Sequence, residues 1–386
     1  MPKQLEPRID INKIDTLDQF VALTQPVGSV EQALSNNMFG INHEQVKGVL
    51  AENRDSYGLT FFTRPQLNFQ TPNLRNIRQF YSLLTTKEFS VHRYVRNTLD
   101  PRLALNPSTK IKTPLVDNRM AFIPILTNNL KSISGWPDIV APFFASKAGV
   151  RKEQWGIVDG TIDIYESFDI DATFRNVKNE PITLMMQSWL AYMSAVFEGM
   201  MSPYLDYIVN NRIDYNTRIY RLVLDESKRY VKKIAATGAS FPVNVPVGKM
   251  FDYNDTSKYN DQTKDINIRF KCFGAIYNDE ILIKEFNEAG GIFNRDIRTM
   301  LRKYSDVGEA LPDATDTLAV IPNELLDKLN HRGYPVIDRT TYELKWYIDK
   351  SSNTYKEITN LIPNAVDKTG NPKYYNFVNG KTLVSN

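Results

Sequence analysis

The chain has 386 residues, of which 42% are hydrophobic and 24% are charged, proportions typical of a folded globular protein rather than a disordered or fibrous one. Its 47 basic and 44 acidic residues leave a formal net charge of +3, which argues against binding nucleic acid or anionic membranes through bulk charge. Because no apolar run reaches the ~18 residues of a membrane span and the first residues lack an apolar signal segment, we expect a protein without a membrane span that folds in a cytoplasm.

Residues 1–56 are expected to form short helices on a polar lead. In "GSVEQALSNNMFG", Ser29 is a candidate helix cap, Gln32 follows three residues later and Gly40 is a stop signal. We interpret this segment as a helical N-terminal extension.

Residues 57–280 are expected to form a β-rich domain that carries a helical insertion at about 71–112. The domain opens with the aromatic stretch "YGLTFFTRPQLNF", in which Pro65 indicates an edge strand or a bulge. Apolar residues at near-helical spacing then predict the inserted helices. "MAFIPILTNNLKSISGW" returns to strand character, with a turn predicted at Asn128 and Asn129.

The segment "DGTIDIYESFDIDATF", residues 159–174, alternates between apolar and polar side chains. Alternation of period two predicts a strand, because successive side chains of an extended chain point to opposite faces. The apolar parity comprises Ile162, Ile164, Phe168, Ile170, Ala172 and Phe174. The polar parity comprises Asp163, Tyr165, Ser167, Asp169, Asp171 and Thr173.

A long helix and three further strands are predicted after this segment. Asn179 and Pro181 supply a cap and a first helical position for "ITLMMQSWLAYMSAVFEGM", whose Met-rich stripe is expected to pack on a sheet. The strands are "TRIYRLVLD", "RYVKKIAATG" and "DINIRFKCFGAIY", the last two separated by the loop "ASFPVNVPVGKMFDYND". Cys272 falls on the apolar parity of the last strand, which favours a buried, inert thiol. The predicted fold class is α+β.

Residues 281–386 are expected to form a C-terminal extension of helices and a hairpin. Gly290 and Gly291 separate two helical pieces, and "PNELLDKLN" begins a third. "YELKWYIDKSSNTYKEI" is predicted to be a hairpin that turns around Ser351 to Asn353.

Few residue patterns point to catalysis or to a bound cofactor. His43, His92 and His331 lie far apart without metal-ligand spacing, and no nucleophile elbow is present, so we expect no metal site and no cofactor. The end "NGKTLVSN" mimics a phosphate loop, but Tyr375 stands where its first Gly would be needed.

The aspartate row leaves two interpretations open. Residues two apart on one strand face lie roughly 6.6 Å from each other, a spacing that paired acids use in glycoside hydrolysis. Alternatively, Asp163, Asp169 and Asp171 belong to an evenly polar sheet face, in which Arg269 and Lys271 of another strand pair with acids. The even polarity of the face favours the second interpretation.

Two short motifs accompany these elements. "RPQLNF" begins at Arg64, and a Gly-aromatic-Pro-x-Asn-Val loop with a following Asp-aromatic pair precedes the last strand. The loop motif comprises Gly238, Pro242, Asn244, Val245, Asp252 and Tyr253. Together with the order of elements over 112–280, these motifs resemble the tail-tube protein family of contractile-tailed bacteriophages.

The resemblance implies a tube fold, an antiparallel β-sandwich or barrel with one packed helix, in a virion structural protein rather than an enzyme. It implies hexameric rings that stack into a hollow tail tube, assembled in the host cytoplasm, through which DNA passes without specific binding. Partners would be further copies, the tail sheath, the baseplate and the tape-measure protein. Residues expected to face the lumen are Asp163, Asp169, Asp171, Arg269 and Lys271.

Two alternatives remain open at the level of sequence. Because the additions at 1–56, 71–112 and 281–386 exceed a minimal tube subunit, a baseplate protein that initiates or caps the tube would also fit. From another class, a carbohydrate-active or hydrolytic enzyme could use the row Asp163, Asp169 and Asp171.

Overall fold

A computed structural model of the protein describes most of the chain after residue 56. The described residues are 57–105, 111–158, 166–248, 251–252, 255–256, 264–326, 332–356, 375–378 and 381–384. The predicted N-terminal extension, the candidate lumen residue Asp163 and the motif residue Tyr253 lie outside them.

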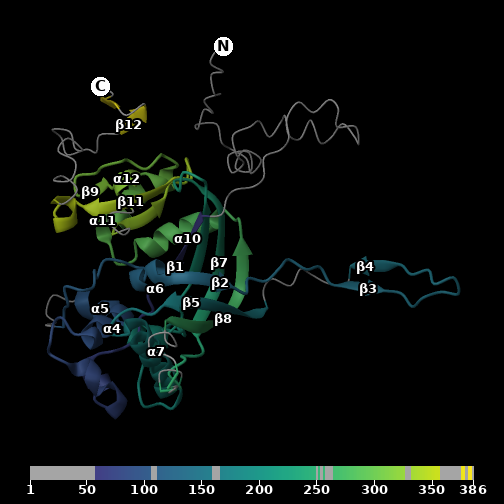
Figure 1. The fold of residues 1–386 in the computed structure, drawn as a ribbon, viewed down its shortest axis with the longest axis horizontal. Helices are drawn as coiled ribbons and strands as arrows, with labels where there is room; N and C mark the ends of the chain where they lie inside the picture. Colours follow the sequence, from purple (N-terminus) through teal and green to yellow (C-terminus); the bar gives the residue numbers. More distant parts are fainter. Residues whose placement is uncertain are drawn as a thin grey trace. The chain divides into compact units, whose positions relative to one another are not determined.

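The largest sheet among the described residues has six strands (Figure 1). Its order is β1 (Tyr57–Phe62), β6 (Ile219–Leu224), β7 (Val231–Pro242), β8 (Asp265–Tyr277), β5 (Ser167–Arg175) and β2 (Leu130–Ser134). β2 with β5, β5 with β8 and β7 with β8 are antiparallel.

The sheet is nearly closed and barrel-like, because residues 121–123, which come shortly before β2 in the chain, bond to the end of β1 at the opposite edge of the sheet. The Arg64 amide donates to the Ala121 carbonyl at 2.9 Å, and the Ile123 amide donates to the Phe62 carbonyl at 2.9 Å. This segment continues through helix α6 (Pro124–Asn129) into β2 at the other edge of the sheet. Strand character was predicted for residues 120–136, and over α6 this was wrong. Pro124 has no N–H for a ladder, and its fixed φ suits a first helical turn.

The predicted long helix is present as α7 (Pro181–Phe197). Its apolar face is fully buried in the main core and includes Ile182, Met185, Met186, Trp189 and Tyr192. Pro181 is its first residue, as predicted, but Glu180 rather than Asn179 is the capping residue, and no side chain caps the end.

Short helices occupy the predicted helical insertion. They are α3 (Thr71–Leu74), the 3-10 helix η3 (Arg78–Leu84), α4 (Val91–Leu99) and α5 (Pro101–Leu105). Leu74, Phe80 and Leu83 are buried in the same core as α7, so their near-helical spacing marks a face that packs inward. A separate two-stranded hairpin, β3 (Phe143–Ala145) with β4 (Gly156–Val158), lies between β2 and β5 in the sequence.

By its contacts the chain divides into two compact units. One comprises residues 60–221 and 235–295, and includes α8 (Leu205–Val209) and α10 (Ile281–Gly290). Of the described residues, the other comprises 57–59, 222–234 and those after 295. The two predicted helices on either side of Gly290 and Gly291 are α10 and α11 (Arg295–Lys303), and the third is α12 (Asn323–Leu326).

The C-terminal strands form their own sheet, which corrects one prediction. β11 (Leu344–Asp349) lies between β10 (Tyr334–Ile337) and β9 (Leu318–Val320), and the described residues beyond it are not its hairpin partner. The predicted hairpin around Ser351 is therefore wrong, because β11 already has an antiparallel partner on each side. A second hairpin, β12 (Tyr375–Val378) with β13 (Lys381–Val384), follows. Among the described residues, no helix has the length and apolar character needed to span a bilayer.

Candidate functional site

Strands β5 and β8 present two chemically opposite faces. Their antiparallel register places Ile170 opposite Phe270 and Ala172 opposite Ile268, and all four side chains are buried. Cys272 on the same face is also fully buried, as predicted, and burial raises the pKa of its thiol to about 11. One face of this strand pair is therefore core, and the thiol stays protonated and unreactive at neutral pH.

The other face of the pair carries alternating acids and bases that are joined across the strands. Asp171 is opposite Arg269, with 2.9 Å between Oδ1 and Nε, and Asp169 is opposite Lys271, with 3.1 Å between Oδ1 and Nζ. The neighbouring Asp171 carboxylate raises the pKa of Arg269. The prediction that these two bases pair with acids is confirmed, and the four charges balance.

This arrangement does not resemble a pair of catalytic acids. The side chains of Asp169 and Asp171 are exposed to solvent, and each carboxylate lies within 3.1 Å of a basic nitrogen. A general acid needs the opposite, a carboxyl whose burial keeps its proton. Among the described residues, no group of three His, Cys, Asp or Glu side chains could hold a metal ion.

Two residues of the loop motif, Gly238 and Asn244, lie close to the backbone of β8. At Gly238 an added Cβ would lie 2.6 Å from the Phe273 carbonyl oxygen, so a side chain there would displace the neighbouring strand. The Asn244 side-chain oxygen accepts the amide hydrogen of Arg269, and the Val243 amide donates to the Arg269 carbonyl at 2.9 Å. The segment predicted as a loop from Ala239 is thus strand up to Pro242, and its continuation still bonds to β8.

Arg64, the first residue of the other motif, is buried and binds backbone carbonyls from two segments of the chain. Its guanidinium donates to the carbonyls of Thr98 and Met120, each at 2.9 Å, and to the carbonyl of Asn97. Burial lowers its pKa to about 10, so it remains charged at neutral pH. It holds the end of α4 against the segment that leads into α6. Sequence reasoning noted this arginine only as part of a motif.

A second buried group, around Asp100, was not predicted. Its carboxylate accepts the Phe69 amide at 2.9 Å and the Tyr204 hydroxyl at 2.7 Å, and burial raises its pKa to about 6. Arg96, one helical turn earlier, donates to the Phe69 carbonyl at 2.8 Å. The spacing of Arg96 and Asp100 was the available signal, but an exposed helical ion pair would look the same in sequence.

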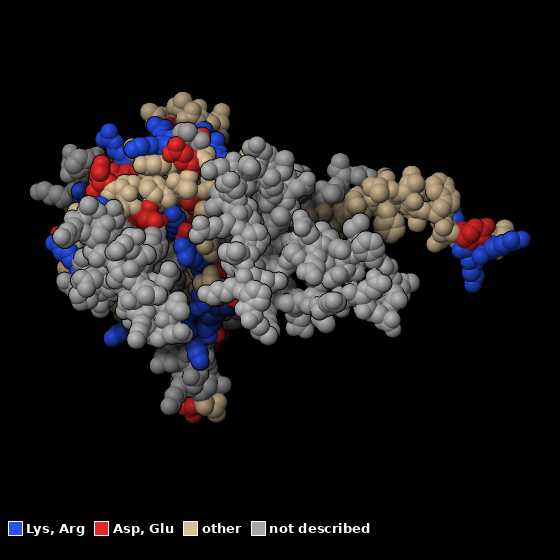
Figure 2. Space-filling model, turned by 90° about the horizontal axis from the view of Figure 1, so that it is seen from above, with Lys and Arg blue, Asp and Glu red and all other residues tan. Residues whose placement is uncertain are grey.

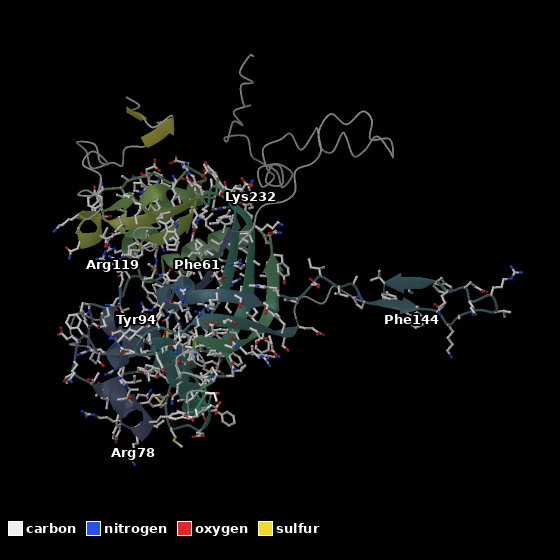
Figure 3. All side chains as sticks on the ribbon, viewed as in Figure 1. Phe61, Arg78, Tyr94, Arg119, Phe144 and Lys232 are labelled. Carbon is white, nitrogen blue, oxygen red and sulfur yellow. The ribbon has the colours of Figure 1, made fainter. Side chains whose placement is uncertain are left out.

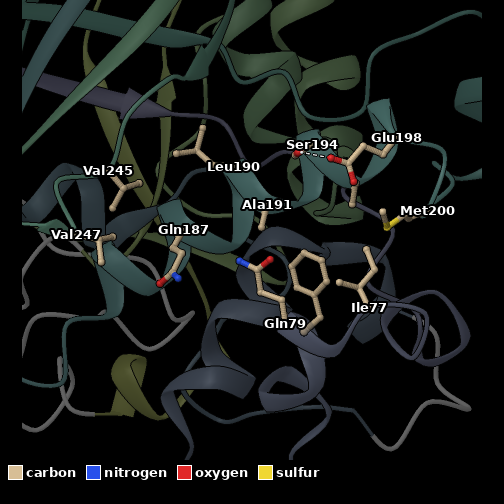
Figure 4. A pocket seen from close by; sticks show the side chains of 12 residues that line it. Ile77, Gln79, Gln187, Leu190, Ala191, Ser194, Glu198, Met200, Val245 and Val247 are labelled. Atoms are coloured by element: carbon tan, nitrogen blue, oxygen red, sulfur yellow. Dashed lines mark hydrogen bonds between the residues drawn. The ribbon is translucent and has the colours of Figure 1, made fainter.

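The outer side of α7 borders a groove of about 540 Å³ (Figure 4). We call it the α7 groove. Its apolar lining comprises Ile77, Phe80, Leu190, Ala191, Ala195, Met200, Val245 and Val247. Of the described residues that line it, Glu198 alone is charged, and Ser194 donates a hydrogen bond to this glutamate at 3.4 Å.

Comparison with known proteins gives one match that covers most of the chain. A family model described as "Putative phage tail tube protein" matches residues 6–365. No curated protein matches the sequence.

Solved structures give distant similarities. The chain resembles the sheath/tube terminator of an extracellular contractile injection system, PVC, in its extended state, at 12% identity and a TM-score of 0.23 over 41% of this chain and 87% of that one. It also resembles the tube-terminating cap of the anti-feeding prophage, at 12% identity and a TM-score of 0.25 over 41% and 81% of the two chains. A chain of the PVC sheath-tube complex is 14% identical, with a TM-score of 0.23 over 41% and 82%.

Proposed function

Because the chain belongs to the phage tail tube protein family, a family of structural components of phage tails, we propose that its copies form hexameric rings that stack into a hollow tail tube. The main support is the two-faced sheet, whose apolar side packs on α7 while its polar side carries balanced ion pairs. Such a sheet suits the wall of a water-filled passage.

The free edge of the sheet supports joining between copies. Within the described residues β2 is an edge strand that pairs with β5 alone. Its five side chains are half-buried or exposed. An exposed edge offers unpaired backbone groups to another strand. In the proposed ring, this edge pairs with the sheet of the neighbouring copy, so that the nearly closed sheets join into one continuous wall.

The polar face of β5 and β8 is the proposed lumen wall. Its residues are Asp169, Asp171, Arg269 and Lys271, with Asp163 as a further candidate. DNA binds proteins chiefly through unpaired Lys and Arg that neutralise phosphates. Because both described bases here are held by aspartates, DNA would pass along the wall without adhering.

We assign residues 57–280 to the tube wall and residues 281–386 to an extension on the tube. The sheath, the baseplate and the tape-measure protein are the proposed partners, and assembly takes place in the host cytoplasm. A baseplate protein that initiates or caps the tube is the alternative role, and it would use the same ring.

Electron microscopy of the purified protein tests the proposal. We expect rings with an open centre that stack into long tubes at high protein concentration. Particles that stop at one ring would indicate the initiator. A protein that stays monomeric at every concentration would contradict both roles.

A further inference from the structure

The hairpin of β3 and β4 is apolar on both faces. Phe143 lies opposite Val158 on one face, and Phe144 lies opposite Ile157 on the other. Trp155 joins the second face, because its carbonyl accepts the Ser146 amide at 2.8 Å in the same register. We call residues 143–158 the apolar hairpin.

None of these large side chains is covered. Phe143 is 75% exposed and Trp155 is 67% exposed, and no residue of either strand is buried (Figure 3, where Phe144 is labelled). An isolated two-stranded ribbon is at best marginally stable in water. Exposed apolar patches of several hundred Å² mark interaction sites, and the three aromatic rings alone expose roughly 400 Å². The apolar hairpin therefore fits a protein partner.

The turn of the hairpin is basic. The turn contains three bases, Lys147, Arg151 and Lys152, and one acid, Glu153. Figure 2 shows these charges gathered at the end of the hairpin, with uncharged surface behind them. A fitting receptor would be an apolar channel with an acidic rim.

The α7 groove has this chemistry. Eight apolar side chains line it, and Glu198 is the one charged residue among the described lining residues. Its volume of about 540 Å³ lies in the range of natural ligand pockets, about 300–1,000 Å³. Gln79 and Gln187 also line the groove and are labelled in Figure 4. Their amide groups can bond to the edge of a strand.

We propose that the α7 groove of one copy receives the second face of the apolar hairpin, Phe144, Trp155 and Ile157, from another copy. The basic turn then lies near Glu198, and the first face, with Phe143 and Val158, is left to pack on a further surface of the assembly. Donor and receptor are different surfaces, so the contact is heterologous and propagates from copy to copy. The inference rests on the proposed function only in requiring that copies assemble.

Crosslinking of coexpressed variants tests the contact. One chain carries Ile157→Cys in the apolar hairpin, and a second, differently tagged chain carries Leu190→Cys in the α7 groove. Cys272 is buried and does not interfere. We expect a disulfide between the two chains under mild oxidation, and none when either variant is expressed alone. With Leu115→Cys, an exposed site outside both surfaces, in place of Leu190→Cys, the disulfide should be absent.

The outcomes separate this inference from the proposed function. Rings or tubes without the disulfide would overturn the hairpin contact and leave the proposed function intact. Absence of any assembly would overturn both. A disulfide formed within single chains that carry both cysteines, but not between chains, would show that the hairpin docks on its own groove and would also overturn the inference.

Substitutions provide an independent check. Trp155→Ser and Leu190→Lys should each raise the protein concentration needed for assembly at least about tenfold, since each removes a buried apolar contact and Lys adds charge opposite a basic turn. Leu190→Met keeps the groove apolar, and Leu115→Ser removes an exposed apolar side chain elsewhere. Both controls should assemble as the parent chain does, and equal defects in controls and test variants would refute the contact.

Discussion

At the scale of single residues, Gly238 is required because two strands approach each other closely. We expect Gly238→Ala to lower the free energy of unfolding by about 1–3 kcal/mol, since its Cβ would lie 2.6 Å from the Phe273 oxygen. Gly248→Ala is the matched control, because an added Cβ there meets no atom within 4 Å. Urea denaturation of both variants measures the difference, and equal stabilities would contradict the argument.

The ion pairs on the polar face should contribute little to the stability of the folded chain. For Asp169 and Lys271 we expect a coupling free energy below about 1 kcal/mol in a double-mutant cycle with Ala, decreasing further at high salt, because both side chains are partly exposed. Denaturation of the four proteins at two salt concentrations gives this value. A much larger coupling would mean that the face is shielded from water in the monomer.

Single-residue environments were predictable where strand parity decides them. The burial of Cys272 and the position of Arg269 and Lys271 on the polar face both follow from alternation along one strand. The role of Arg64 was not predictable, because its carbonyl acceptors at Thr98 and Met120 come from distant parts of the chain.

At the scale of elements, the helices of residues 71–105 are tied to the core through Asp100. The pKa of Asp100 is about 6 in the folded chain, against 3.8 for an ordinary Asp. Between these two pH values the Asp100 carboxyl keeps its proton in the folded chain and loses it in the unfolded chain. The contribution to stability is therefore full below about pH 3.8 and lost as the pH rises through 6.

Thermal and urea unfolding of the parent chain and Asp100→Asn between pH 4 and 7 tests this. We expect the parent to lose about 3 kcal/mol relative to the variant over this range, from about two pKa units at 1.36 kcal/mol each. The buried Asp214, whose pKa burial also raises, is present in both proteins and cancels in the difference. A difference that stays constant with pH would show that Asp100 ionises normally.

Element type was predictable where the apolar period was long. α7 and β8 were both recognised from a repeated period, and the β3–β4 hairpin, without such a period, was missed. α6 was mistaken for strand, because the pattern of apolar and polar side chains over six residues fits both the helical and the strand period. Only the position of Pro124, at the first turn, favours the helix.

At the scale of the whole molecule, the proposed lumen makes a prediction about retained nucleic acid. Asp169→Lys with Asp171→Lys should leave assembly intact but give tubes that copurify nucleic acid, because the freed and added bases bind phosphates. The retained nucleic acid should resist nuclease, since the tube wall covers it. Absorbance ratios and nuclease digestion of purified tubes measure both effects.

The control places the same charge reversal at two other exposed acids, Asp306→Lys with Glu309→Lys. Nucleic acid bound to this variant should be digested readily. Equal digestion in the two variants would place the polar face of β5 and β8 on the outside of the assembly.

By itself, the sequence determined the α+β class, the long helix, and which residues of each alternating strand face the core, because side-chain periodicity is a local property of the backbone. Tertiary structure alone decided that β8 is the strand opposite Asp169 and Asp171, that the chain before α6 returns to β1, and that no other described segment covers the α7 groove or the apolar hairpin. These features depend on contacts between residues far apart in the chain, and local patterns of hydrophobicity carry no information about which distant partner satisfies them.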